Sequence, residues 1–229
     1  AVLGVICAEE SALAQTADYT IKLPWAFDES VCQTRSVTNL YAANLLLMAY
    51  LSQDFKLIAD LQTAILDGNT FMAQWEDALA AIAAEDWSQA VILADGEIAG
   101  LAQEGALALS EIARVPGRHY HVLDVRHGPM VLLDRSHLAV VALTKEGFQY
   151  QKDLVTALLT KGVKVITYSD QPLKPIPGVT LQVHSGRKLD PAARGLHFIL
   201  LPQMLAVYKA QHKKVNPDQP EGLSPWIKL

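Results

Sequence analysis

The sequence predicts an α/β protein built from parallel βαβ units. Short apolar runs rich in β-branched residues alternate along the chain with longer segments whose apolar residues repeat at helical spacing. This alternation is typical of helices packed on a parallel sheet. With 229 residues, 51% of them hydrophobic and 19% charged, the chain can bury a core and is too apolar to be disordered.

The first part of the chain holds two expected strands followed by helices. Val37, Leu40 and Leu47 recur at helical spacing within the longest expected helix. The triplet Asp67-Gly68-Asn69 contains a glycine breaker, so we expect one helix to end there and another to follow. The expected elements are strands at 2–7 and 20–23, a helical turn at 9–15, and helices at 29–51, 54–66 and 70–84.

A second unit opens at Trp87 and repeats the strand–helix rhythm. Its first helix is expected to stop at Pro116-Gly117, and a proline-rich loop over 171–178 separates its last two strands. The expected strands lie at 90–94, 119–123, 138–143, 163–168 and 180–183, and the expected helices at 98–114, 146–160 and 191–213.

These elements divide the chain into four parts. Residues 1–67 form a first unit, 68–86 a connecting helix, 87–215 a second unit, and 216–229 a tail whose three prolines exclude a regular helix. The two units share one rhythm, so the first reads as an incomplete copy of the second. Because the chain opens directly in a strand without an initiator Met, we expect that residues preceding its start belong to the protein.

Charge and composition exclude several classes of function. A formal net charge of −5 and a pI near 5.8 give no basic surface for nucleic acid. No apolar run reaches the roughly 18 residues of a membrane helix. Cys7 and Cys32 do not make a disulfide framework, and without a secretory segment a reducing cytoplasm is the expected setting.

The expected helix 98–114 carries the first candidate catalytic group. Glu104 and Glu111 lie seven residues apart, so two helical turns place both on one face. Gly105 and Ala106 keep the neighbouring surface small, so another backbone can approach closely. A carboxylate held beyond a strand end is a reasonable general base, although two glutamates on a helix are more often a solvated face.

The loop after the expected strand 119–123 carries the second candidate. Gly128 permits a tight backbone and Pro129 fixes its own φ, so His127 is presented stiffly. Its imidazole can accept or donate a proton near neutral pH, and Arg126 can bind phosphate or orient a carboxylate. A lone loop histidine is still more often structural.

The polar start of the long helix at 29–36 is a third candidate. Free N–H groups at a helix start suit an anion or a hydroxyl, and ordinary capping by Ser30 is an equally good interpretation. His119 and His121 alternate along a strand, but no acidic or cysteine cluster of suitable spacing supports a metal. The sequence contains neither a P-loop nor a dinucleotide fingerprint, and we expect no cofactor.

Together these segments resemble the two-lobed sugar isomerase (SIS) family, in which ketose–aldose isomerases and amino-sugar-6-phosphate deaminases are found. The most specific likeness is the spacing between the glutamate helix and the His-Gly-Pro loop. The segments that carry the resemblance are EGALALSEI at 104–112, RHGP at 126–129, NPDQP at 216–220 and, less closely, VCQTR at 31–35.

The resemblance implies a fold and a set of roles. The fold is a three-layer αβα arrangement with flavodoxin-like parallel sheets, one partial lobe followed by one complete lobe. Glu111 moves a proton between C1 and C2 of an open-chain sugar phosphate, and His127, supplied by the neighbouring subunit of a homodimer, assists ring opening. The remaining site residues contact the substrate: Val31, Gln33, Thr34, Glu104 and Arg126.

The sequence also departs from the family pattern. The Ser/Thr-rich phosphate loop of the first lobe has no counterpart in residues 1–229, so the chain as given is expected to bind sugar phosphate poorly. Ala108 and Pro225 stand where the synthase members have lysines, and Lys228 is offset, which favours a deaminase or a plain isomerase over amidotransfer. A non-catalytic sugar-phosphate sensor is the alternative, but no helix-turn-helix or basic face supports it.

Overall fold

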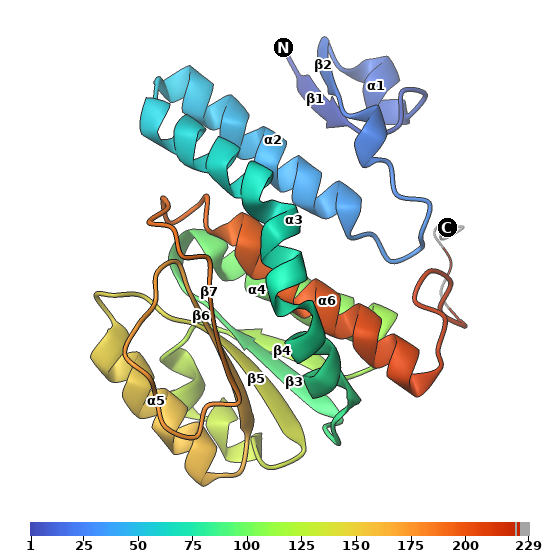
Figure 1. The fold of residues 1–229 in the computed structure, drawn as a ribbon. Helices are drawn as coiled ribbons and strands as arrows, with labels where there is room; N and C mark the ends of the chain where they lie inside the picture. The colour runs from blue at the N-terminus through green and yellow to red at the C-terminus, as the bar shows by residue number, and fades with distance from the viewer. Residues whose placement is uncertain (223, 225–229) are drawn as a thin grey trace.

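A five-stranded parallel sheet forms the centre of the molecule in the computed structural model, which describes residues 1–222 and 224 (Figure 1). The strand order is β4-β3-β5-β6-β7, the flavodoxin-like order. The strands are β3 (Gln89–Leu93), β4 (Gly117–Tyr120), β5 (His137–Ala142), β6 (Lys164–Ser169) and β7 (Leu181–His184). The helices that follow them are α4 (Ala99–Ile112), α5 (Phe148–Thr160) and α6 (Gly195–Lys213).

Helices cover both faces of this sheet, because successive residues of a strand point to opposite sides. On one face Ile92 and Val140 pack with α3, α4 and α6, and on the other Val91 and Val141 pack with α5. β5 is buried along its whole length, as expected for a central parallel strand. The predicted three-layer α/β fold is confirmed, and this unit is a single lobe.

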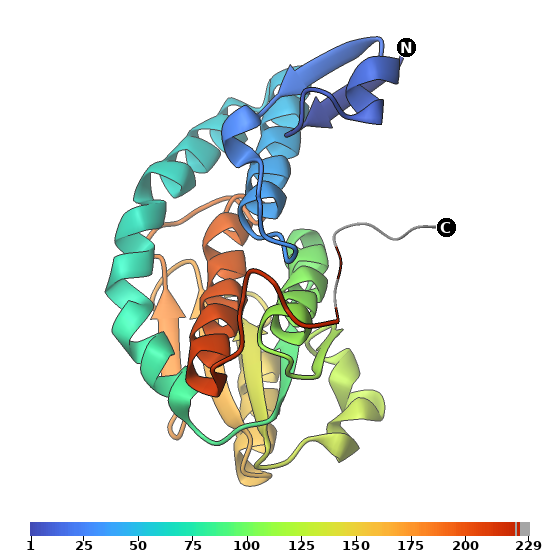
Figure 2. The same cartoon turned by 90° about the vertical axis from the view of Figure 1, so that its right-hand side faces the viewer.

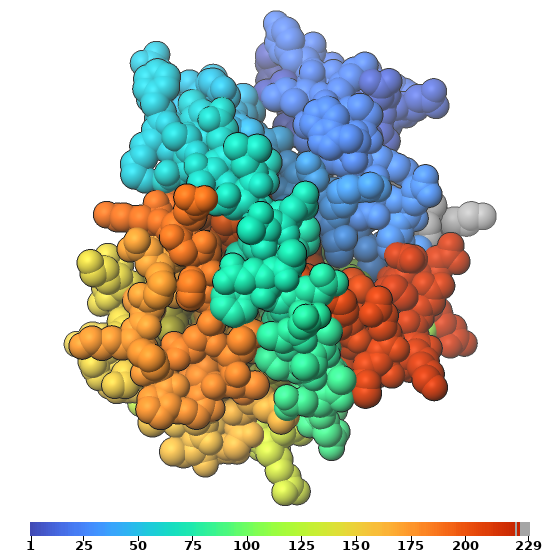
Figure 3. All heavy atoms as spheres, viewed as in Figure 1, coloured from blue at the N-terminus to red at the C-terminus, as the bar shows by residue number. Residues whose placement is uncertain are grey.

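The N-terminal segment forms its own small parallel sheet, seen at the top of Figure 2, and the same segment lies at the top of the space-filling view in Figure 3. It consists of β1 (Leu3–Ile6), α1 (Ala12–Thr16) and β2 (Tyr19–Lys22), followed by a 3-10 turn and α2 (Arg35–Ser52). The two predicted strands are therefore present. Their assignment to an incomplete first lobe, and the division of the chain at residues 67, 86 and 215, stay predictions.

One long helix replaces two that the sequence predicted. α3 runs unbroken from Phe55 to Ala84 through Gly68, so the prediction of a break at residues 67–69 is wrong. Leu61, Ala64 and Phe71, on either side of the glycine, are buried, and α3 packs extensively on α6. Tertiary packing outweighs the roughly 1 kcal/mol by which glycine disfavours a helix.

Other boundaries differ by a few residues. α2 begins at Arg35 rather than at residue 29, because residues 29–34 form a turn. α6 begins at Gly195 rather than at 191, and it continues through Pro202. Over the described part of the chain, no helix combines the length and apolar character needed to cross a membrane.

Candidate functional site

Helix α4 presents Glu104 and Glu111 on its half-exposed face, while its other side packs into the core. Gly105 allows the predicted close approach, because a Cβ built there meets the Pro202 ring of α6 at 2.5 Å. Lys213 Nζ closes the end of α4 by donating to the carbonyls of Ala113 (2.8 Å) and Arg114 (2.9 Å). Contacts with α6 therefore fix the position of α4 along its axis and its rotation about that axis, and with them the position of the two glutamates.

The charges of the two carboxylates interact, in keeping with their predicted position on one face of the helix. Partial burial raises the pKa of Glu104, and the negative charge of Glu111 raises it further. A like charge disfavours ionisation of its neighbour, so the pair shares a common electrostatic environment.

The turn that precedes α2 lies against Glu111. The Cys32 side chain is 3% exposed and its thiol hydrogen-bonds to the Glu111 carboxylate. Burial, then the charge and hydrogen bond of Glu111, then the charge of Asp218 raise the pKa of this thiol to about 11. A neutral thiol is therefore a donor beside the carboxylate throughout the physiological pH range.

The tail after α6 holds this turn in place, and Figure 2 shows it running back beside α4. The carbonyl of Asp218 accepts the Val31 N–H (3.0 Å) and the Ser30 hydroxyl (3.2 Å). Arg114, just after α4, donates to the Glu221 carbonyl (3.1 Å). The described part of the predicted tail thus contacts both the turn and α4, whereas Pro225 and Lys228 lie outside the described residues.

Asp28 caps α2, so the predicted alternative of capping by Ser30 is wrong. The Asp28 carboxylate accepts hydrogen bonds from the N–H groups of Thr34 (2.9 Å) and Arg35 (3.0 Å) and so occupies the predicted anion position.

The predicted sugar-contacting residues of the turn are partly accessible. Gln33 is exposed and accepts a hydrogen bond from the Ser36 hydroxyl (2.7 Å), while Thr34 and Val31 are half-buried. These three side chains remain available for hydroxyl or apolar contacts with a ligand.

His127 occupies a different part of the lobe. It ends a 3-10 turn, η3 (Asp124–His127), and Gly128 follows at φ 153°, a conformation that favours glycine as predicted. Val125 of this turn packs in the core on the α5 face of the sheet, opposite the face that α4 covers. Arg126 and His127 are exposed, and among the described residues no hydrogen bond or ion pair joins either of them to Glu111.

Within one chain, then, the structure brings together the α4 glutamates, the turn at 31–34 and the tail, and it leaves the His-Gly-Pro loop apart. No contact in this region was predicted from the sequence for Cys32, Asp28 or Asp218. The position of Cys32 between Val31 and Gln33, two predicted site residues, could have indicated that it lies close to the candidate site. Among the described residues there is no group of three or more His, Cys, Asp or Glu side chains that could hold a metal.

Comparisons with known proteins identify relatives of the chain. No family model matches the chain. The chain is 31% identical over 230 residues to the D-galactosamine-6-phosphate deaminase of Shewanella sp. (strain ANA-3), an alignment that covers 95% of this chain and 55% of the deaminase. The chain therefore spans about half the length of that relative.

Solved structures share the fold. The C-terminal domain of glucosamine-fructose-6-phosphate aminotransferase from Francisella tularensis superposes with a TM-score of 0.82 at 18% identity, over 95% of this chain and 64% of that one. The tagatose-6-phosphate ketose/aldose isomerase of Escherichia coli gives a TM-score of 0.75 at 24% identity, over 99% and 63%. The homologues and structural neighbours of this chain are therefore SIS-type phosphosugar isomerases, isomerising aminotransferases and amino-sugar-phosphate deaminases.

Proposed function

We propose that the protein containing this chain isomerises a phosphorylated sugar between aldose and ketose, or deaminates an amino-sugar 6-phosphate of the glucosamine type through the same proton transfer. The observation that carries the proposal is the convergence of Glu111, the turn at 31–34 and the tail on one face of α4. Relatives that act on sugar phosphates support the substrate class.

In this proposal Glu111 is the general base. It removes the proton from C2 of an open-chain aldose, giving an enediol, and returns it to C1, while the hydroxyl proton moves from O2 to O1. With a 2-amino sugar the enolamine becomes a ketimine, which water hydrolyses to the ketose with loss of ammonia. Val31, Gln33 and Thr34 line the sugar, and Glu104 lies beside it.

His127 serves ring opening at the Glu111 of a second copy. Its exposed position on the opposite face from α4 agrees with a site shared between subunits. Arg126 then contributes a cation to the same shared site. The homodimer and the cytoplasmic setting remain predictions.

A complementation assay in the full-length protein tests the shared site. We expect Glu111→Gln and His127→Asn each to abolish turnover of glucosamine 6-phosphate, galactosamine 6-phosphate and the matching ketose phosphates. After unfolding and remixing the two variants, half of the dimers are mixed and each holds one intact site, so about a quarter of wild-type activity returns.

Two results distinguish the alternatives. Full activity of Glu111→Gln would refute the role of the base, and failure of the mixture to recover activity would refute the shared site. A sugar phosphate that raises the melting temperature but is never turned over would identify a sensor.

A further inference from the structure

A cleft opens at the carboxyl end of the five-stranded sheet, separate from the Glu111 face. Its volume is about 780 Å³, the size of a small-molecule site. It lies where β3 and β5 are neighbours but their following connections run to opposite faces, which is the position where open α/β sheets bind ligands. Its lining includes Lys56, Lys145, Lys188 and Arg194, together with five carboxylates.

Arg194 lines this cleft, and its guanidinium is incompletely bonded. The residue is only 7% exposed, and its Nη1 donates to the Leu143 carbonyl at the end of β5 (3.2 Å). Its Nε is buried without a hydrogen-bond partner, and none of the ion pairs among residues 1–222 and 224 includes Arg194. A buried arginine that makes no ion pair is unusual, and an anion bound in the cleft would give it one.

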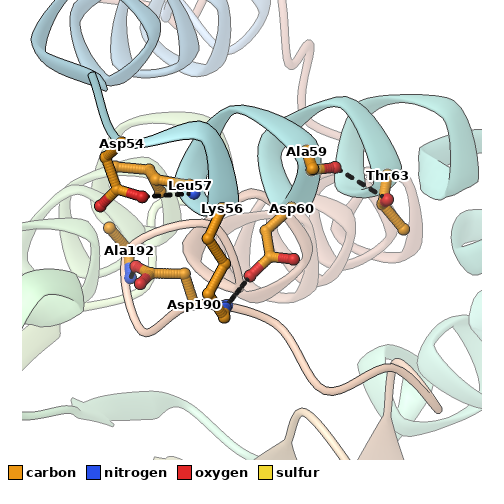
Figure 4. A network of polar contacts seen from close by, with 8 residues as sticks. All are labelled: Asp54, Lys56, Leu57, Ala59, Asp60, Thr63, Asp190 and Ala192. Carbon is orange, nitrogen blue, oxygen red and sulfur yellow. Dashed lines mark hydrogen bonds and ion pairs between the residues drawn. The ribbon is translucent and has the colours of Figure 1, made fainter. Parts of the chain in front are cut away.

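Some of the other charged side chains of the cleft form hydrogen bonds or ion pairs within the protein, and others do not. Lys56 pairs with Asp60, which also accepts the Asp190 N–H (2.7 Å), and Asp190 in turn accepts the Ala192 N–H (2.9 Å) (Figure 4). These contacts stabilise one wall of the cleft. Because Lys56 is already paired with Asp60, it is not available to bind a ligand.

Lys145 and Lys188 have no partner among the described contacts, and both line the cleft with Arg194. Three cationic side chains therefore line the cleft, of which Lys145 and Lys188 are unpaired and Arg194 has its Nε unbonded. Thr144, Gln171, Glu97 and Glu146 offer acceptors and donors for hydroxyl groups on the same walls.

We propose that this cleft binds a small phosphorylated, hydroxyl-bearing metabolite, with Arg194 holding the phosphoryl group from the floor and Lys145 and Lys188 closing on it from the rim. The site is distinct from the proposed catalytic one, which lies on α4, the turn at 31–34 and the tail. Binding here does not depend on Glu111.

Hydrogen–deuterium exchange of the full-length protein tests the site by location. Inorganic phosphate and glucose 6-phosphate, each at increasing concentration, should slow exchange over residues 144–147 and 189–194, and glucose should not. Arg194→Gln should raise the half-saturating concentration roughly tenfold or more, as expected for loss of a charged hydrogen bond. Lys188→Met should raise it by a smaller factor.

The matched control is Lys161→Met, which removes an exposed lysine at the end of α5 that does not line the cleft. It should bind both phosphate probes as the wild type does. If Arg194→Gln does not fold, the pair Lys145→Met and Lys188→Met replaces it and should show the same loss.

Absence of protection by both phosphate probes would overturn the proposal, as would equal protection by glucose. An effect of Lys161→Met as large as that of Lys188→Met would also overturn it, because the cations would then act only as surface charge.

Discussion

Replacing Gly105 by Ala tests whether the contact between α4 and α6 sets the position of the two glutamates. A Cβ at this position lies 2.5 Å from Cγ and 2.8 Å from Cβ of Pro202, whereas ordinary Cβ contacts lie at 3.4–4 Å. The obstacle is a proline ring inside a helix, so it cannot swing aside as a flexible side chain does. One helix must move by about an ångström.

The expected effect is the difference between two opposing terms. Overpacking of this kind costs up to about 3 kcal/mol, and alanine is favoured over glycine in a helix by about 1 kcal/mol. Their difference predicts that Gly105→Ala lowers the free energy of unfolding by about 2 kcal/mol, measured by urea denaturation. In the full-length protein the same shift of α4 should lower turnover.

Gly100→Ala is the matched control, because it lies on the same helix and has nothing within 4 Å of a built Cβ. It should leave the free energy of unfolding unchanged or raise it by up to about 1 kcal/mol. If Gly105→Ala proved as stable as Gly100→Ala, the claim that Pro202 fixes the position of α4 would be refuted.

Three further predictions concern the other elements. Gly68→Ala should stabilise the protein by about 1 kcal/mol in urea denaturation, because Gly68 lies inside α3 with open space around it, and a loss of stability would contradict the unbroken helix. Asp28→Ala should lower the free energy of unfolding by about 1–2 kcal/mol by removing the cap of α2, whereas Asp28→Asn should retain most of it, and equal losses would argue against capping. The folded pKa of Cys32, about 11, lies above its unfolded value of about 8.5, so its contribution is complete below pH 8.5 and is lost as the pH rises towards 11. The fall in stability between pH 8 and 10.5 should therefore be smaller in Cys32→Ala, and an identical fall would count against the buried thiol.

The sequence predicted the sheet better than the helix boundaries. Strands such as β5 are short, continuous apolar runs, and burial on both faces is read directly from composition. The triplet Asp67-Gly68-Asn69 misled because local propensity amounts to about 1 kcal/mol, and the buried neighbours on α6 that override it are distant in sequence.

The separate segments of the candidate site were easier to predict from the sequence than the way in which they come together. Helical spacing placed Glu104 and Glu111 on one face, but only the family resemblance connected that face with the turn at 31–34. The thiol beside Glu111 and the carbonyl of Asp218 are contacts between segments far apart in sequence, which no local pattern encodes. That His127 meets the Glu111 of a second copy stays a prediction.

The bond between Ser30 and Asp218 joins residues 188 positions apart, and this separation imposes an order on folding. On the ribosome the small N-terminal sheet, the long helix and the central strands emerge well before the segment that closes the turn at 31–34. Contacts of such long range are formed late, because the chain entropy lost in closing the loop is recovered only when both ends have docked. A nascent chain can therefore acquire its secondary structure while the face around Glu111 is still open, and that face becomes complete only after the segment around Asp218 has emerged.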